Sequence, residues 1–147
     1  MQLTRHTDYA LRLLIHLAEA GSERVQIADV AKAQRISQTH LMKVANHLAH
    51  LGFVETQRGR GGGVRLAREP RDINLAEVVC GTEPGTALVQ CGACGLMAAG
   101  CRLPSIFGQA LGAFQDVLAR YSLAELMAGP NGAPRLPGPG HTAIESD

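Results

Sequence analysis

The sequence predicts a mainly α-helical protein with a small β-hairpin wing: a winged helix-turn-helix followed by a long C-terminal helix. Three observations carry this prediction. The first two are helical apolar periodicity over most of the first 50 residues and a glycine-rich hairpin directly after it. The third is an apolar seam along residues 104–121. Apolar residues make up 46% of the 147 residues but aromatic ones only 3%, so the core must be aliphatic.

Three helices are predicted before the hairpin, since apolar residues recur there at a spacing of three to four. The first covers residues 7–20, with Thr7 as its N-cap. The second covers residues 26–34. The third covers residues 37–51, with Ser37 as a good N-cap. The short connection between the second and third helices is typical of a helix-turn-helix.

The hairpin is predicted from two short strands around a glycine turn. Residues 53–57 and 64–66 have strand character, and residues 58–63 read RGRGGG. After the hairpin, Asn74 and Glu77 are spaced as a capping box and predict a short helix to about Val79.

A long helix is predicted over residues 104–121, with Pro104 in its first turn. Its apolar positions form one seam: Ile106, Phe107, Ala110, Leu111, Phe114, Val117, Leu118 and Tyr121. Residues 129–140 hold four Gly and four Pro, which predicts a disordered tail. The expected division is a DNA-binding domain (1–80), a cysteine loop (81–102), a dimerisation helix with its end (103–127) and the tail (128–147).

The charge is divided unevenly along the chain, although the net charge is only +1. Residues 1–71 hold 11 basic and 6 acidic residues, whereas residues 72–147 hold 3 and 7. This asymmetry favours a first half that binds a polyanion and a second half with another task. No apolar run reaches the roughly 18 residues of a membrane span, and the first residues do not resemble a signal peptide. We therefore expect a cytoplasmic protein without a membrane partner.

The order helix, turn, helix and basic hairpin predicts binding to double-stranded DNA. The N-terminal residues of the third helix would enter the major groove, and the arginines of the hairpin would contact phosphates or a narrow minor groove. The candidate DNA-binding residues are Ser37, Gln38, Thr39, His40, Lys43, Arg58 and Arg60. The alternative is a plain helical hairpin followed by a flexible glycine loop.

The cysteines are confined to the second half. Cys91 and Cys94 form a CxxC pair, and six residues separate Cys94 from Cys101. Three close thiolates suit a [4Fe–4S] cluster, a [2Fe–2S] cluster or a tetrahedral zinc. A thiol–disulfide switch and inert thiols are the alternatives. Cys80 follows an apolar helix and is more typical of a small core residue than of a ligand.

No arrangement of catalytic residues is present in the sequence, so we do not expect an enzyme. The CGAC segment lies outside any βαβ pattern, which disfavours a thiol oxidoreductase.

Several segments together resemble the winged-helix iron–sulphur regulators, the family that includes IscR. These segments are TDYALR (7–12), HLMKV (40–44), RGRGGG (58–63), TEP (82–84), CRL (101–103) and YSLAEL (121–126). The TDYALR, HLMKV and TEP segments are similar to the nitric-oxide-sensing branch of that family. The resemblance covers residues 1–127. Two features depart from the family pattern: the CxxC interval is short, and Cys80 stands where relatives often carry Arg.

The resemblance implies a bacterial homodimer whose long helices pair, and which represses genes for nitric oxide detoxification from a palindromic operator. It implies a cluster, [4Fe–4S] before [2Fe–2S], held by Cys91, Cys94 and Cys101. Its fourth ligand would be Asp8 of the partner subunit. Without the resemblance, Asp8 is simply an acid in the first turn of a helix, where its charge interacts favourably with the positive end of the helix dipole. A regulator that senses iron or redox state, and one with a structural zinc, remain the alternatives.

Overall fold

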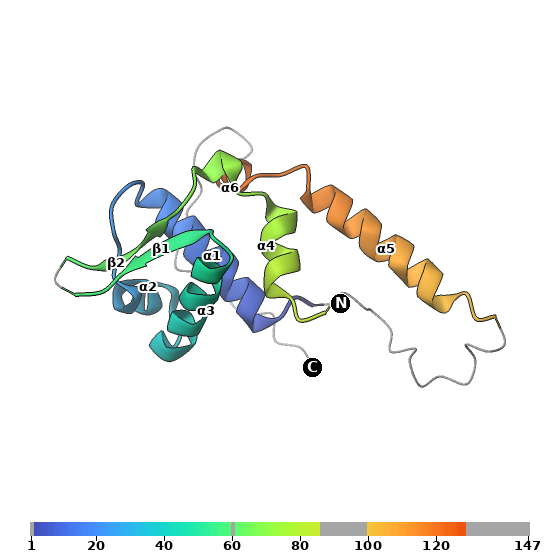
Figure 1. Ribbon diagram of the computed structural model, residues 1–147, viewed down its shortest axis with the longest axis horizontal. Helices are drawn as coiled ribbons and strands as arrows, with labels where there is room; N and C mark the ends of the chain where they lie inside the picture. Colours follow the sequence, from blue (N-terminus) through green and yellow to red (C-terminus); the bar gives the residue numbers. More distant parts are fainter. Residues whose placement is uncertain (1, 60, 86–99, 129–147) are drawn as a thin grey trace.

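The computed structural model describes residues 2–59, 61–85 and 100–128 (Figure 1). The elements of these ranges are α1 (Arg5–Glu19), α2 (Ile27–Gln34), α3 (Gln38–His50), β1 (Val54–Gln57), β2 (Gly63–Leu66), the 3₁₀ helix η1 (Pro70–Asp72), α4 (Leu75–Thr82), α5 (Leu103–Leu118) and α6 (Leu123–Met127). The predicted fold class is confirmed: the protein is mainly helical, with one antiparallel hairpin. Within the described ranges, every helix is too short or too polar to cross a membrane.

Helix α1 is the centre of the winged-helix body, which comprises α1 to α4, the hairpin and α6. Its inner face, at Ala10, Leu13, Leu14 and Leu17, is fully buried against α3, α4 and β2. These positions have the spacing of one helical face, as the sequence predicted. Burying each leucine contributes roughly 1.5–3 kcal/mol, so this face alone supplies much of the folding energy.

The start of α1 differs from the prediction. Thr4, not Thr7, is the N-cap, and its hydroxyl accepts a hydrogen bond from the Thr7 amide at 3.3 Å. Thr7 lies inside the helix and is fully buried, where its hydroxyl accepts from the Thr82 hydroxyl at 3.0 Å. Both threonines are residues that can cap a helix. The hydrogen bond between Thr7 and Thr82, which lies 75 positions further along the chain, places Thr7 inside the helix and leaves Thr4 as the cap.

Helix α4 extends three residues beyond the predicted end at Val79. The Asn74 side chain caps it by accepting from the Ala76 amide at 2.9 Å. The predicted capping box is wrong, because the Glu77 carboxylate accepts instead from Arg68 at 3.3 Å. The expectation of a core position for Cys80 is also wrong. Cys80 is exposed and accepts a hydrogen bond from the Gln115 side chain of α5 at 3.4 Å.

Helix α5 extends away from the winged-helix body (Figure 1). It begins one residue before Pro104 and ends three before Tyr121, and none of its residues is buried. The predicted apolar seam is therefore not part of the core of a single chain. The chain then returns to the body, where Leu123 of the short helix α6 is fully buried. Its amide donates to the Ile73 carbonyl at 2.8 Å, which fixes the end of α5 beside α4.

Candidate nucleic-acid interface and cysteine segment

The turn between α2 and α3 fixes the angle of the helix-turn-helix. Arg35 ends α2 in the left-handed conformation, with φ 54°. The next residue, Ile36, is buried, and its amide donates to the Ala31 carbonyl at 2.9 Å. One strained residue and one apolar anchor therefore make the tight turn that the sequence predicted there.

Helix α3 has one buried and one exposed face. Its inward residues, Leu41, Val44, Ala45 and Leu48, belong to the core. Five polar side chains are exposed at its start and in the next turn: Ser37, Gln38, Thr39, His40 and Lys43. Ser37 is the N-cap residue, but its hydroxyl makes no capping hydrogen bond and so remains available to a ligand. The structure brings these five predicted residues together at one end of α3, where a recognition helix contacts bases.

The hairpin is attached rigidly to the helix-turn-helix. Val25, just before α2, exchanges two backbone hydrogen bonds of 2.9 Å with Val64 of β2. The Gln26 side chain donates to the carbonyl of Gly62 near the tip. A side chain at Gly63 would approach the Val25 carbonyl oxygen to 2.8 Å, so this close contact requires glycine.

These contacts hold the tip of the hairpin on the side of the fold that carries α2. Arg58 is exposed there. Arg60, the other predicted wing residue, lies outside the described residues.

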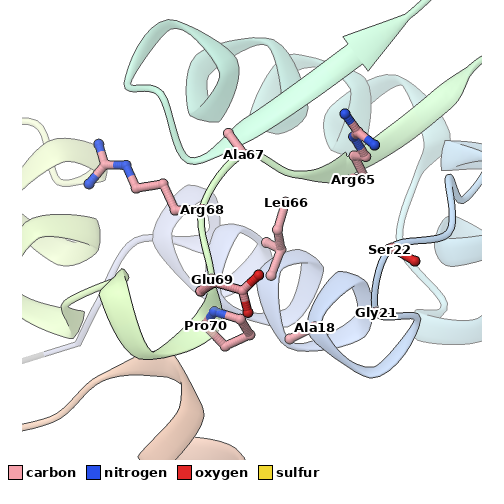
Figure 2. Close-up of a pocket in the computed structure, with 9 residues that line it drawn as sticks. All are labelled: Ala18, Gly21, Ser22, Arg65, Leu66, Ala67, Arg68, Glu69 and Pro70. Carbon is pink, nitrogen blue, oxygen red and sulfur yellow. The ribbon is translucent and has the colours of Figure 1, made fainter.

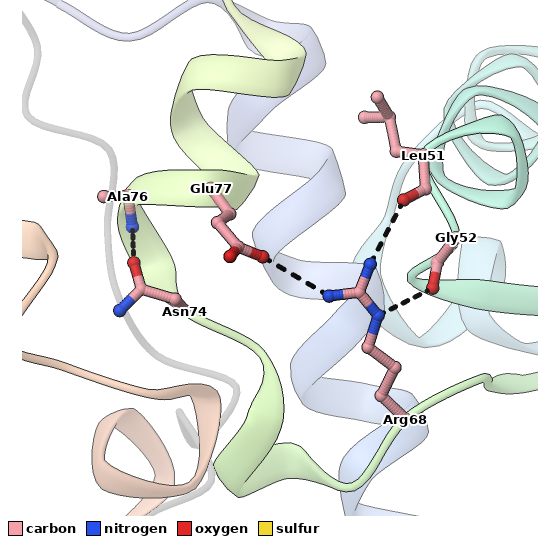
Figure 3. A network of polar contacts seen from close by, with 6 residues as sticks. All are labelled: Leu51, Gly52, Arg68, Asn74, Ala76 and Glu77. Atoms are coloured by element: carbon pink, nitrogen blue, oxygen red, sulfur yellow. Dashed lines mark hydrogen bonds and ion pairs between the residues drawn. The ribbon is translucent and has the colours of Figure 1, made fainter.

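Arg68 joins three elements and was not identified from the sequence (Figure 3). Its guanidinium donates to the carbonyls of Leu51 and Gly52, at 3.5 and 3.2 Å, just beyond the end of α3. It also pairs with Glu77 of α4 and lies 5.0 Å from the ring centroid of Phe53. A cation at these carbonyls complements the negative end of the helix dipole. No sequence signal pointed to this contact, because 16 positions separate Arg68 from Gly52.

A surface pocket of about 440 Å³ lies between the end of α1 and the segment after β2 (Figure 2). Ala18, Leu66 and Pro70 supply its apolar lining, and Ser22 and Glu69 add polar groups. Its two arginines are already paired: Arg65 with Glu55 at 2.8 Å, and Arg68 with Glu77 at 3.3 Å. Neither arginine is therefore free of an ion pair to bind an anion in this pocket.

The candidate cluster ligands are only partly described. Cys91 and Cys94 lie outside the described residues. Cys101 is half-buried just before α5, and its sulfur is a thiol. Asp8 is half-exposed in the first turn of α1 and pairs with Arg12 at 3.0 Å. In the described part of the chain, no three His, Cys, Asp or Glu side chains lie close enough to hold a metal ion.

Comparison with known proteins identifies the kind of molecule to which this chain is similar. Residues 3–129 match the family model of Rrf2, described as an iron-dependent transcriptional regulator. The chain is 44% identical over 133 residues to the HTH-type transcriptional regulator NsrR of Shouchella clausii, with 86% of this chain and 89% of the relative covered. The NsrR of Bacillus subtilis is also 44% identical over 133 residues, with 86% and 90% covered.

Solved structures show the same fold. CymR, the global cysteine regulator of B. subtilis, superposes with a TM-score of 0.69 at 23% identity, over 86% of this chain and 95% of that one. The IscR of T. potens gives a TM-score of 0.67 at 24% identity, over 86% and 85%.

Proposed function

The chain belongs to the Rrf2 family of DNA-binding transcriptional regulators, and we propose that nitric oxide controls its DNA binding through an iron–sulphur cluster. As predicted, it is a regulator and not an enzyme. The observation that carries the finer proposal is the 44% identity to regulators named NsrR over 86% of the chain. A regulator of bacterial DNA works in the cytoplasm, where thiols stay reduced and available to a metal.

The proposed ligands are Cys91, Cys94 and Cys101 of one subunit and Asp8 of the partner subunit. The donor chemistry fits a [4Fe–4S] cluster: three thiolates suit iron, and one harder oxygen ligand leaves a more readily displaced position. Such a cluster supplies an iron to which nitric oxide can bind. Neither side chain is fully buried in the single chain, since Cys101 is half-buried and the Asp8 carboxylate is half-exposed. A [2Fe–2S] cluster is the second choice for the same thiolates.

Pairing of α5 between two chains is the proposed basis of dimerisation. The exposed apolar side chains of α5 include Leu103, Ile106, Phe107 and Val117. Covering them with the same surface of a second chain gives a two-fold homodimer with two copies of α3. Such a dimer reads a palindromic operator, because its half-sites lie about one DNA turn, ~34 Å, apart.

Release of Asp8 is the proposed signal to the DNA-binding surface. Asp8 lies in the first turn of α1, and α1 packs directly against α3. Bound to iron in the partner, the Asp8 carboxylate would tie the start of α1 to that partner. Without iron it would pair with Arg12, its neighbour at 3.0 Å. A shift of α1 then changes the spacing of the two α3 helices, and a coupling of ~1–3 kcal/mol is enough to switch a promoter. The proposed result is loss of repression.

The test uses the full chain, purified without oxygen, with iron, sulfide and zinc measured and the visible spectrum followed during a nitric oxide titration. The proposal predicts a broad band near ~400 nm that bleaches at a few nitric oxide molecules per cluster. Several bands that resist nitric oxide would instead indicate an iron or redox sensor with a [2Fe–2S] cluster. A colourless zinc protein would overturn the proposal and leave only the DNA-binding regulator.

The role of Asp8 is tested by Asp8→Ala, with Asp29→Ala as the control. Both aspartates lie in the first turn of a helix, α1 and α2 respectively, so both changes remove the same dipole interaction. Only Asp8→Ala should alter the spectrum and the nitric oxide response. If it retains both as in the wild type, Asp8 is not a ligand.

A further inference from the structure

The start of α1 is held by Thr82, the last residue of α4, and by Glu83, which follows it. The Glu83 carboxylate accepts hydrogen bonds from the Thr4 amide at 2.8 Å and from the Thr4 hydroxyl at 3.1 Å. Beside it, the Thr82 hydroxyl donates to the Thr7 hydroxyl at 3.0 Å. We call these four residues, Thr4, Thr7, Thr82 and Glu83, the α4–α1 latch.

The inner half of the latch is buried. Thr7 and Thr82 are the buried polar residues of the described ranges, and each finds a hydrogen-bond partner. The Thr82 hydroxyl also donates to the Val78 carbonyl at 2.8 Å, and the Thr7 hydroxyl lies 3.1 Å from that of Thr4, so both buried hydroxyls are held in place by more than one partner. The latch is therefore a well-defined contact, unlike the exposed ion pair of Asp8 and Arg12 in the same helix.

The same turn of α1 also contacts the recognition helix. The Nε2 atom of His6 lies 2.8 Å from the Nδ1 atom of His47 on α3, and their ring centroids are 5.0 Å apart. This hydrogen bond requires at least one neutral ring.

Glu83 is ionised at neutral pH. Burial raises the pKa of its carboxyl, but hydrogen bonds from Thr7 and Thr4 and the nearby His6 outweigh that effect and lower it. An ionised acceptor makes the stronger, charge-assisted hydrogen bonds to the Thr4 amide and hydroxyl.

We propose that Glu83 is a positioning residue that couples α4 to the recognition helix α3 through the first turn of α1. The path runs from Glu83 to Thr4, along the first turn to His6, and across to His47. It deepens the proposed function, on which it rests, because Glu83 precedes Cys91, the first proposed cluster ligand after it, by eight positions in the sequence. Displacing Glu83 would loosen α1 and α3 together, without any change in a residue that contacts DNA.

Hydrogen–deuterium exchange on the cluster-free full chain tests the path without depending on iron. Glu83→Ala should speed exchange about tenfold at the first-turn amides of α1 and at α3 around His47. Glu83→Gln keeps an oxygen acceptor and should retain most of the protection. His6→Ala cuts the second step and should affect α3 without releasing Thr4.

Glu125→Ala is the matched control, because Glu125 caps α6 through hydrogen bonds to the Ser122 amide and hydroxyl, at 2.7 and 2.9 Å. It should leave α1 and α3 unchanged. Wild-type exchange in Glu83→Ala would overturn the proposal, as would faster exchange at α1 without any change at α3.

A second measurement connects the latch to regulation. A DNA duplex selected from a random pool by the iron-loaded wild type serves as the probe, and its affinity is measured with and without the cluster. Glu83→Ala should reduce the ratio of the two affinities at least fivefold, whereas Glu125→Ala should not. Equal affinities in the wild type would refute cluster control itself, and the exchange result would still decide the latch. An unchanged ratio in Glu83→Ala would overturn the latch alone.

Discussion

The winged-helix body and α5 have similar apolar patterns but opposite environments. Leu13, Leu14 and Leu17 of α1 are fully buried, whereas Ile106 and Val117 of α5 are 54% and 50% exposed. Both helices show the spacing of an amphipathic helix, and both were predicted from it. Periodicity therefore locates an apolar face but does not say whether the same chain or a second copy covers it.

The largest effect is expected from charge placed on the exposed apolar face of α5. Ile106→Glu with Val117→Glu should convert a dimer to monomers, because two buried carboxylates would oppose pairing across the two-fold axis. Losing the second half-site should weaken operator binding by about 100-fold or more. Sedimentation equilibrium and fluorescence anisotropy with the selected duplex measure the two effects.

The helical content of this double variant should be that of the wild type, since neither residue is buried within the chain. A variant that stays dimeric would show that dimerisation uses another surface.

A cavity in the winged-helix body should instead destabilise the fold of each chain. Leu48→Ala removes a fully buried side chain of α3 and should lower the free energy of unfolding by about 2–5 kcal/mol. Met42→Ala on the same helix is the control, because Met42 is 49% exposed and should cost less than ~0.5 kcal/mol. Urea unfolding at two protein concentrations measures both values; equal losses would mean that α3 does not pack as described.

The wing should contribute charge rather than sequence preference. Arg58→Ala should reduce the slope of log affinity against log salt by about 0.9, the value for one phosphate contact. It should weaken binding to all duplexes alike. Arg120→Ala is the control: Arg120 is also exposed, but it follows α5 and not the wing. Equal slopes for Arg58→Ala and the wild type would exclude a contact between Arg58 and phosphate.

The smallest expected effect concerns the turn before α3. Arg35 has φ 54°, a conformation that glycine adopts without steric cost. Arg35→Gly should therefore raise the free energy of unfolding by about 0.5–1 kcal/mol. Gln34→Gly, inside the last turn of α2, should lower it by up to ~1 kcal/mol. A loss of stability in Arg35→Gly would mean that the arginine side chain stabilises the turn.

The sequence predicted well those elements whose bounds depend only on neighbouring residues. The ends of α2 and α3 and both strands lie within one residue of the predicted bounds, since the capping residue, the turn and the apolar face agree there. Long-range contacts decided the remainder. Thr82 holds Thr7 inside α1, so Thr4 is the cap. The Glu77 carboxylate accepts from Arg68 instead of closing the expected capping box. The short helix α6 begins at a capping box formed by Ser122 and Glu125, a signal that is present in the sequence but was not used to predict the helix.

The residues of the candidate site also fall into those that neighbouring residues could predict and those that they could not. The exposed end of α3 could be predicted because its polar residues precede a regular apolar face. Arg68, His6 and His47 could not, since each matters through a partner far away in the sequence. Asp8 carries no local signal for metal binding at all; only the family resemblance distinguishes it from an ordinary acid in the first turn of a helix.

The most direct test of the central claim is operator affinity measured three times on one oxygen-free preparation. The selected duplex is titrated with the iron-loaded protein, then after a few nitric oxide molecules per cluster, and finally after removal of the iron. We expect tight binding at first and a loss of affinity of roughly 5–150-fold in both later states. Affinity that is unchanged by nitric oxide and by iron removal would contradict the central claim.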